Sequence, residues 1–168
     1  MSTESTALTN REAIPMQNYD DKRLVTVGGR SGALLNKTVG RLAKLGISLM
    51  GSRLLSVRGR KSGEWRSTPV NLLTIDGQRY LLAPRGHTQW VRNIRVTPEA
   101  QLRVGRRIET FRAEEIADAD KPEVIRAYLK KWAWEVGAFF GDDVKADSST
   151  ETLLRVAPGF PVFKVHAV

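Results

Sequence analysis

Short apolar runs separated by tight-turn signals fill residues 53–113, and this pattern restricts the fold more than any other feature of the sequence. Asp76-Gly77 lies between the runs Trp65–Ile75 and Gln78–Pro84, and an Asp-Gly pair in this position is a strong signal for a β-hairpin. Gly105-Arg106-Arg107 marks a second hairpin. Because such short turns reverse the chain, we expect antiparallel strands. The other predicted strands are Arg53–Arg58, Ala100–Val104, Ile108–Ala113, Thr152–Val156 and Phe160–Val165.

Two amphipathic helices are expected beside these strands, with a helical turn or two over Gln89–Val96. Residues 36–50 have apolar positions three and four apart. This helix could cover a barrel mouth or lie on a membrane surface through its basic side. The second helix follows Asp120, an expected N-cap, with Pro122 in its first turn. Its apolar face comprises Val124, Ile125, Tyr128, Leu129, Trp132 and Val136.

Six or so short strands with flanking helices predict an α+β domain. A small barrel is the expected closure, because it leaves the fewest exposed strand edges. The length of 168 residues suits one domain. Residues 1–30 lack apolar periodicity, so we expect a flexible N-terminal arm followed by a single domain over residues 31–168.

The positive charge is concentrated in one part of the chain. Residues 53–112 hold 13 basic and 4 acidic residues and therefore account for the whole net charge of +9. Twelve of those 13 basic residues are arginine, which suits bidentate recognition of phosphate and carboxylate groups. A polyanionic partner is the indicated ligand: a phosphorylated small molecule, nucleic acid or an anionic membrane. A merely solvated basic surface is the alternative.

Several chemistries are disfavoured by composition. The chain has no cysteine and only two histidines, so no disulfide or thiolate chemistry is expected, and no metal site. The sequence contains neither the apolar run of a signal peptide nor one long enough to span a membrane. We therefore expect a cytoplasmic location and, if the protein is an enzyme, a cofactor that performs the chemistry.

Two stretches carry candidate binding motifs. Gly59–Pro69 (GRKSGEWRSTP) is a glycine-containing turn with basic and hydroxyl side chains. It could bind phosphate through backbone N–H groups or could be an ordinary charged hairpin tip. Ala83–Arg95 (APRGHTQWVRNIR) leaves a strand, passes Gly86 and enters a short helix on which Trp90 and Asn93 share a face.

Together the two stretches resemble the deazaflavin (coenzyme F420)-dependent nitroreductase family of actinobacteria. The motifs are GRKSGxxRxxP and then APRG with QWxxNI. The resemblance implies a split β-barrel related to the barrels that bind flavin mononucleotide (FMN). It also implies an oxidoreductase that passes hydride from reduced F420 to an unsaturated or nitro-bearing organic substrate. F420 carries a phosphate and several glutamates, which would account for the arginine-rich stretch.

The resemblance also assigns cofactor-binding residues. It implies that Lys61 and Arg66 hold the phosphate and acidic tail, beside Arg60 and Ser62. Thr68 and Pro69 would run along the ring. The residues implied to wrap and close the other side are Ala83, Pro84, Arg85, Gly86, Gln89, Trp90 and Asn93. Two positions depart from the family pattern, because nitroreductases often have serine at Pro84 and glycine at His87.

Other candidate residues concern catalysis and the substrate. His87 could donate a proton, since its ordinary pKa suits that role near neutrality. Aromatic residues that could wall a substrate pocket, or belong to the core, are Tyr128, Trp132, Trp134, Phe139 and Phe140. The apolar GAFFG stretch could instead form a homodimer contact. The alternative functions are an FMN-binding oxidoreductase, a non-catalytic lipid or cofactor carrier, and a basic nucleic-acid-binding barrel.

Overall fold

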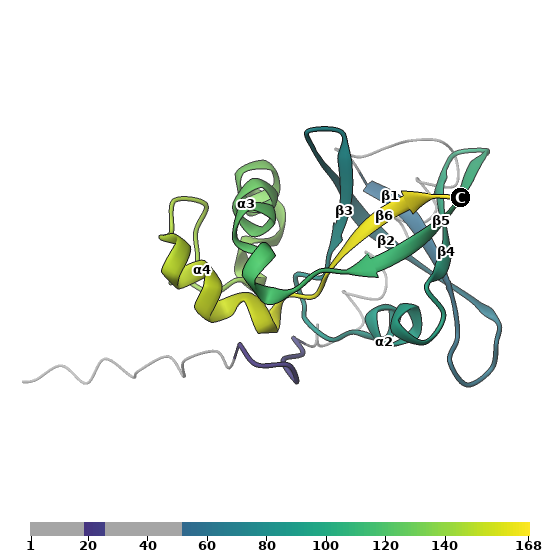
Figure 1. Ribbon diagram of the computed structural model, residues 1–168, viewed down its shortest axis with the longest axis horizontal. Helices are drawn as coiled ribbons and strands as arrows, with labels where there is room; N and C mark the ends of the chain where they lie inside the picture. Colours follow the sequence, from purple (N-terminus) through teal and green to yellow (C-terminus); the bar gives the residue numbers. More distant parts are fainter. Residues whose placement is uncertain (1–18, 26–51) are drawn as a thin grey trace, which may run out of the picture.

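The computed structural model describes residues 19–25 and 52–168 (Figure 1). Six antiparallel strands form a closed barrel in the order β1-β2-β3-β6-β5-β4. They span Ser52–Arg58, Trp65–Ile75, Gln78–Leu82, Glu99–Val104, Arg107–Glu115 and Val162–Ala167 for β1 to β6. The helices are α2 (Gln89–Val96), α3 (Pro122–Val136) and α4 (Thr150–Val156), with short 3₁₀ turns at Asp118–Asp120, Gly137–Phe139 and Ala157–Gly159. The predicted α+β barrel fold is confirmed.

The hairpin signals correspond to real turns. Asp76 and Gly77 have φ values of 48° and 80°, the left-handed pair that a two-residue hairpin turn requires. The register runs from Ile75 opposite Gln78 to Leu72 opposite Leu81. The β4–β5 hairpin pairs in the same antiparallel manner.

The core has two parts, one inside the barrel and one outside it. Inside lie apolar side chains such as Leu55, Leu81 and Phe111, and α2 packs Val91 and Ile94 onto them. Outside, α3 and α4 lie together at one side of the barrel (Figure 1). There α3 buries its predicted apolar face against residues of β2, β3 and β6.

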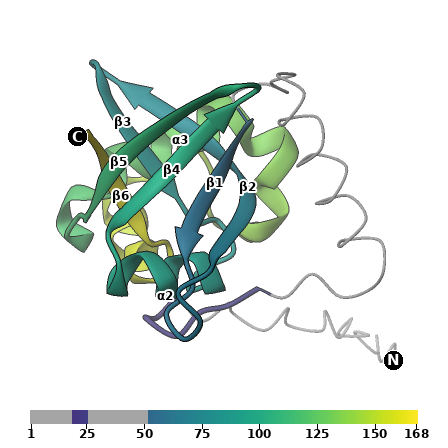
Figure 2. The ribbon, with the colours of Figure 1, turned by 90° about the vertical axis from the view of Figure 1, so that its right-hand side faces the viewer.

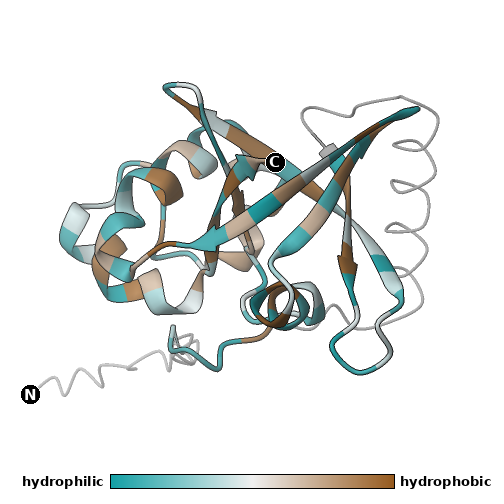
Figure 3. Cartoon of the chain, turned by 45° about the vertical axis from the view of Figure 1, so that its right-hand side comes forward, coloured by the Kyte–Doolittle hydropathy of each residue, from teal (hydrophilic) through white to brown (hydrophobic). Residues whose placement is uncertain are grey.

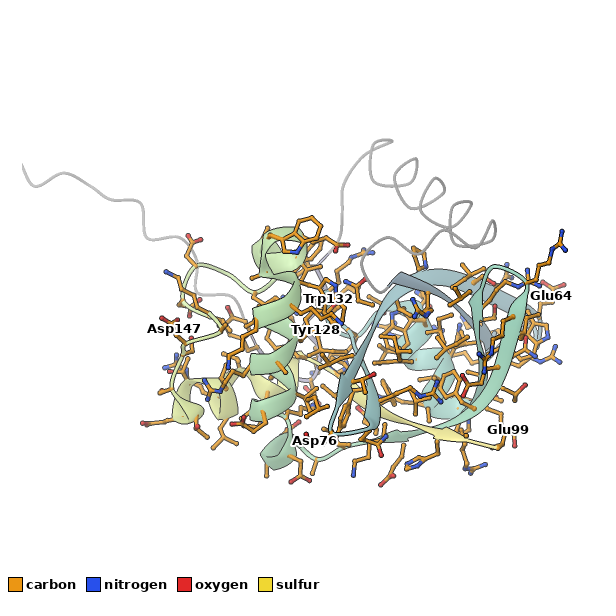
Figure 4. The ribbon with its side chains drawn as sticks, turned by 90° about the horizontal axis from the view of Figure 1, so that it is seen from above. Glu64, Asp76, Glu99, Tyr128, Trp132 and Asp147 are labelled. Carbon is orange, nitrogen blue, oxygen red and sulfur yellow. The ribbon has the colours of Figure 1, made fainter. Side chains whose placement is uncertain are left out.

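The two ends of the barrel are closed differently. Helix α2 covers one end, beside the loop between β1 and β2 (Figure 2). At the other end, the guanidinium of Arg79 donates two hydrogen bonds to the carboxylate of Glu109. Figure 4 shows this separation, since Glu64 in the β1–β2 loop and Asp76 in the β2–β3 turn lie on opposite sides of the barrel.

Two sequence predictions about secondary structure are wrong. Thr152–Val156 is helical and not a strand, because Ser149 caps the helix by accepting a hydrogen bond from the Thr152 amide at 3.1 Å. Leu153 and Val156, three residues apart, then point into the core. The N-cap of α3 is Lys121, since Asp120 belongs to the preceding 3₁₀ turn.

Residues 19–25 lie against the barrel although they fall within the predicted arm. Tyr19 packs on Phe160 and donates a hydrogen bond to the carbonyl of Phe140 at 2.7 Å. The backbone of Val25 pairs with that of Arg85. These seven residues therefore differ from the expected flexible arm. The expected helix over 36–50 and the predicted boundary at residue 31 lie outside the described residues.

Candidate cofactor-binding cavity

A cavity of about 900 Å³ has three main walls from separate stretches of sequence, and Leu24 adds to its lining. Its walls are the β1–β2 loop with the first half of β2, the loop from β3 into α2, and the C-terminal part of α3. The volume is in the range of cofactor and drug-sized sites. The predicted site residues that line it are Arg60, Lys61, Ser62, Arg66, Thr68, Pro69, Ala83, Pro84, Arg85, Gln89, Trp90, Asn93 and Tyr128.

The β1–β2 loop is shaped by its own backbone and one serine. The amide of Gly59 donates to the carbonyl of Glu64, and the amide of Gly63 donates to the carbonyl of Gly59, both at 2.8 Å. The Ser62 hydroxyl accepts a hydrogen bond from the Glu64 amide. A Cβ on Gly59 would lie 2.8 Å from the Ser62 hydroxyl. A side chain at position 59 would therefore displace the Ser62 hydroxyl from this arrangement.

Arg60 attaches this loop to α2. Its backbone amide and its Nη1 both donate to Oδ1 of Asn93, at 3.1 and 2.9 Å. Its Nη1 also donates to Oε1 of Gln89 at 2.8 Å. Three predicted ligand-binding residues are thus bonded to one another, and the loop and the helix form one continuous wall of the cavity.

Lys61 and Arg66 differ from Arg60 in their surroundings. Both are exposed, and the side chain of Arg66 is 63% accessible with the Glu64 carboxylate 3.5 Å away. Across the part of the chain that the structure describes, no ion pair involves Lys61. The loop is hydrophilic throughout (Figure 3). The cavity mouth therefore carries positive charge that is at most weakly paired within the protein.

The opposite wall depends on Gly86, which does not itself line the cavity. Gly86 has φ +90°, and a Cβ there would lie 2.2 Å from the carbonyl oxygen of Arg23. Only glycine fits both the backbone angle and the close approach of residues 19–25. Its role in the structure is to let this segment pack behind the wall.

The third wall combines apolar side chains with a buried polar pair and the exposed Glu135. Leu82, Val136 and Phe139 contribute apolar side chains to the cavity. Tyr128 points from α3 toward the barrel (Figure 4) and is 2% exposed, and Asn71 on β2 hydrogen-bonds its side chain. Burial raises the pKa of the Tyr128 hydroxyl well above its ordinary value. Like an ordinary tyrosine, Tyr128 is protonated at neutral pH, so its hydroxyl is available as a hydrogen-bond donor in the cavity lining.

His87 does not line the cavity, in contrast to its predicted position beside the ring. It is 6% exposed, its Nε2 lies 3.1 Å from the carbonyl oxygen of Pro158, and its Nδ1 lies 3.0 Å from Nη1 of Arg95. Arg95 is itself bonded to Glu115. Burial lowers the pKa of His87. Both ring nitrogens are engaged within the protein, so this geometry argues against a proton donor to substrate.

Trp134 is also outside the cavity. It is 66% exposed at the surface of α3, and its indole N–H donates to the carbonyl of Lys131. Trp132 and Phe140 are fully buried in the core, whereas Phe139 does line the cavity. Of the aromatic residues considered for a substrate pocket, Tyr128 and Phe139 are therefore the two that the fold brings to it.

Several lining residues were not expected from the sequence. Asn71 interrupts the apolar residues Val70 and Leu72 of β2, and this interruption was the available signal. Glu135 lies near the end of the apolar face of α3. Leu24 comes from the segment that lacked any periodicity. No local pattern could place Leu24 here, because its contacts are with residues about 60 positions away.

Within residues 19–25 and 52–168, no three potential metal-ligating side chains of the histidine, aspartate or glutamate type gather in one place. None of the helices described in the structure has the length and apolar character needed to cross a membrane.

The closed antiparallel barrel, with a cationic cavity mouth and an apolar interior, has the features of the split-barrel flavin and deazaflavin oxidoreductases. A search of curated proteins gives no match. The family model described as F420H(2)-dependent quinone reductase matches residues 35–136, more than half of the chain. The chain belongs to this family. It is an F420-dependent oxidoreductase, and the match favours F420 over the FMN alternative.

Two solved structures agree with this chain at the level of fold. The Agrobacterium tumefaciens protein Atu2129, of unknown function, is 15% identical with a TM-score of 0.51, covering 84% of this chain and 57% of that one. A structure described as a domain-swapped dimer is 16% identical with a TM-score of 0.50, covering 81% and 99%. An F420-H2 dependent reductase (FDR-A) is 18% identical with a TM-score of 0.46, covering 69% and 94%.

Proposed function

We propose that this chain reduces a quinone, one kind of unsaturated organic substrate, with hydride from reduced F420 bound in the cavity. The observation that carries the proposal is the joining of a cationic mouth and an apolar, tyrosine-containing interior in one cavity. A long polyanionic cofactor with a flat ring needs both features, and a quinone needs the second. The quinone itself comes from the name of the family.

The residues present fit F420. Lys61 and Arg66 would hold its phosphate and glutamate carboxylates, because exposed cations that lack strong partners can form charge-assisted hydrogen bonds to them. Thr68 and Pro69 would lie along the ring on one side. The opposite side would be formed by Ala83, Pro84, Arg85, Gln89, Trp90 and Asn93. When bound in reduced form, F420 supplies a hydride, so the protein must supply orientation and electrostatics.

Tyr128 has the chemistry to assist at the substrate oxygen. Hydride addition to a quinone carbonyl system leaves negative charge on oxygen, and one proton then completes the hydroquinone. A buried hydroxyl that stays protonated can donate a hydrogen bond to that oxygen as charge develops. The Asn71 side chain holds the hydroxyl in place. The proton itself would come from solvent through the cavity mouth.

A homodimer, a cytoplasmic location and contact of residues 36–50 with a membrane surface also remain proposals. A solved structure of the same fold is described as a domain-swapped dimer. The apolar GAFFG stretch would not serve a dimer through Phe140, since that ring is fully buried. Light scattering on the purified chain would test the homodimer, and the same measurement with lipid vesicles would test the membrane contact.

An anaerobic turnover assay tests the proposed activity directly. Purified protein is mixed with reduced F420 and menadione, and the reappearance of oxidised F420 is followed by its absorbance. We expect saturable turnover that depends on both compounds. Tyr128→Phe, which keeps the ring and removes the hydroxyl, should lower kcat by about 10-fold or more. Trp134→Phe, on the same helix and outside the cavity, is the matched control and should be unchanged.

A further inference from the structure

The guanidinium of Arg23 is a junction between three separate parts of the fold. Its Nη1 donates to the carbonyl oxygens of Pro84 and Gly159, at 2.9 and 3.2 Å. Its Nη2 donates to the carbonyl oxygen of Phe139. Pro84 and Phe139 both line the cavity, on different walls. One side chain therefore connects the loop wall to the wall that follows α3.

The surroundings of Arg23 are unfavourable for a buried cation. The residue is 6% exposed, and its three acceptors are neutral carbonyls rather than carboxylates. Its Nε is buried without a hydrogen-bond partner among the described residues. Burying a cation that is incompletely satisfied costs free energy. An apolar side chain of similar size could stack on Phe160 as the guanidinium does, at 4.4 Å from the ring centre, without that cost.

The backbone around Arg23 strengthens the same junction. The carbonyl of Arg23 accepts a hydrogen bond from the His87 amide at 2.8 Å. Gly86 and Gly159 leave room for this, since a Cβ on either would collide with Arg23. Leu24, the next residue, bridges to Gly86 and lines the cavity. The segment is thus fitted between the two walls and completes the cavity between them.

We propose that Arg23 is a positioning residue that fixes the spacing of the two cavity walls, and through it the fit of the substrate. The inference rests on the proposed function for its substrate and on the described contacts for its mechanism. Without the guanidinium, the Pro84 carbonyl and the Phe139 carbonyl lose their common donor. The two walls should then move independently, and the cavity should accept substrates with less selectivity for size.

Hydrogen exchange on the unliganded full chain tests the junction itself. Arg23→Met keeps the apolar packing on Phe160 and removes all three hydrogen bonds to the carbonyls. The His87 and Phe140 amides lie just behind the two walls, next to the lining residues Thr88 and Phe139. We expect exchange of both amides to rise together by about tenfold. Lys121→Met is the control for loss of a buried cation. Lys121 donates to the Ala157 carbonyl and to the Asp118 carboxylate, and it lies outside the cavity lining.

Steady-state kinetics tests the consequence for the substrate. In Arg23→Met we expect KM for menadione to rise about tenfold while kcat changes less than about threefold. The ratio of kcat/KM for menadione to kcat/KM for the smaller 1,4-benzoquinone should also move closer to one. Arg23→Lys, which keeps the charge but not the planar fork, should fall between wild type and Arg23→Met, and it replaces Arg23→Met if that variant does not fold.

Three results would overturn the inference: unchanged exchange at either wall, an equal rise in Lys121→Met, or an unchanged KM in a variant whose walls do exchange faster. Failure of the proposed function looks different. A wild-type chain that does not oxidise reduced F420 with a quinone would remove the substrate role, while the exchange experiment would still decide whether Arg23 joins the walls.

Discussion

The two ends of the barrel use their cations in opposite ways. At the end formed by the β2–β3 turn, Arg79 and Glu109 form a bidentate ion pair with contacts of 2.7 and 2.5 Å, and both side chains are about one-third exposed or less. At the α2 end, Lys61 and Arg66 are exposed beside the cavity, and Arg66 has only the loose contact with Glu64.

The difference separates structural charge from charge available to a ligand. A paired arginine cannot offer its donors to an anion without losing its partner, whereas an exposed, weakly paired cation loses little. Some of the positive charge of residues 53–112 is therefore paired within the fold, and some is exposed and available to a ligand. The α2 end is the one where exposed cations are weakly paired, which supports the proposal that the cofactor binds there.

The largest expected effect is on cofactor affinity at the α2 end, where the cations are weakly paired. Lys61→Ala and Arg66→Ala should each weaken F420 binding by about 1.5–3 kcal/mol, the range for hydrogen bonds to charged groups. Binding is measured by titration of F420 fluorescence. In wild type the affinity should fall with rising salt, and in the double variant this salt dependence should be smaller.

Arg112→Ala is the matched control for charge, because Arg112 is exposed on β5 and makes only a 3.9 Å contact with Glu99. It should bind F420 as wild type does. Equal losses in Arg112→Ala and Lys61→Ala would mean that general attraction, and not the β1–β2 loop, holds the cofactor.

A smaller loss of F420 affinity is expected when the β1–β2 loop is detached from α2. Asn93→Ala removes the acceptor for the backbone amide and the guanidinium of Arg60. The loop should then be less ordered before binding, and F420 affinity should fall by about 1–2 kcal/mol. Arg92→Ala, exposed on the same helix, is the control. Unchanged affinity in Asn93→Ala would show that the loop does not depend on α2.

At the end of the barrel with the Arg79–Glu109 ion pair, the expected effect is on stability and not on cofactor binding. The hydrogen bond from Arg79 holds the pKa of Glu109 below its ordinary 4.5. The ion pair therefore stabilises the fold above about pH 4.5, and this contribution is lost as the pH falls further, through the folded-state pKa. Arg79→Met should flatten the acid limb of unfolding measured by urea titration and leave F420 affinity unchanged. A weaker affinity for F420 would contradict the division between the ends.

The smallest effect, a change in the pH dependence of stability, is expected at His87. Burial lowers its pKa, with Arg95 and Lys121 adding to the decrease, against the Pro158 hydrogen bond and Glu115. The unfolded chain therefore takes up a proton first, and stability should decline as the pH falls below the ordinary value of 6.5. His87→Gln should remove this slope. Turnover at neutral pH should change less than about tenfold.

The sequence could predict the barrel because its signals are local. Asp76-Gly77 determines a hairpin from two residues, and the apolar face of α3 repeats within a single helix. The strand predicted at Thr152–Val156 failed because β-branched residues resembled a strand while the deciding cap, Ser149, lies just before them.

The site was predictable only where its residues lie in motifs. The residues predicted to bind the cofactor, from Arg60 to Asn93, line one cavity, apart from Gly86. The engagement of both ring nitrogens of His87 depends on Arg95 and Pro158, and no spacing in the sequence indicates those contacts. Arg23 lies 61 residues from Pro84 and 136 from Gly159, in a stretch without periodicity. Long-range contacts of this kind come from the closed fold.

The most direct test of the central claim is to map F420 on the protein by amide hydrogen exchange during a titration. We predict saturable binding with protection at residues 59–68 and 83–93, at the α2 end, and no change at the β2–β3 turn or around Glu109. Protection centred on Arg79 and Glu109, or no binding of F420 at all, would contradict the account.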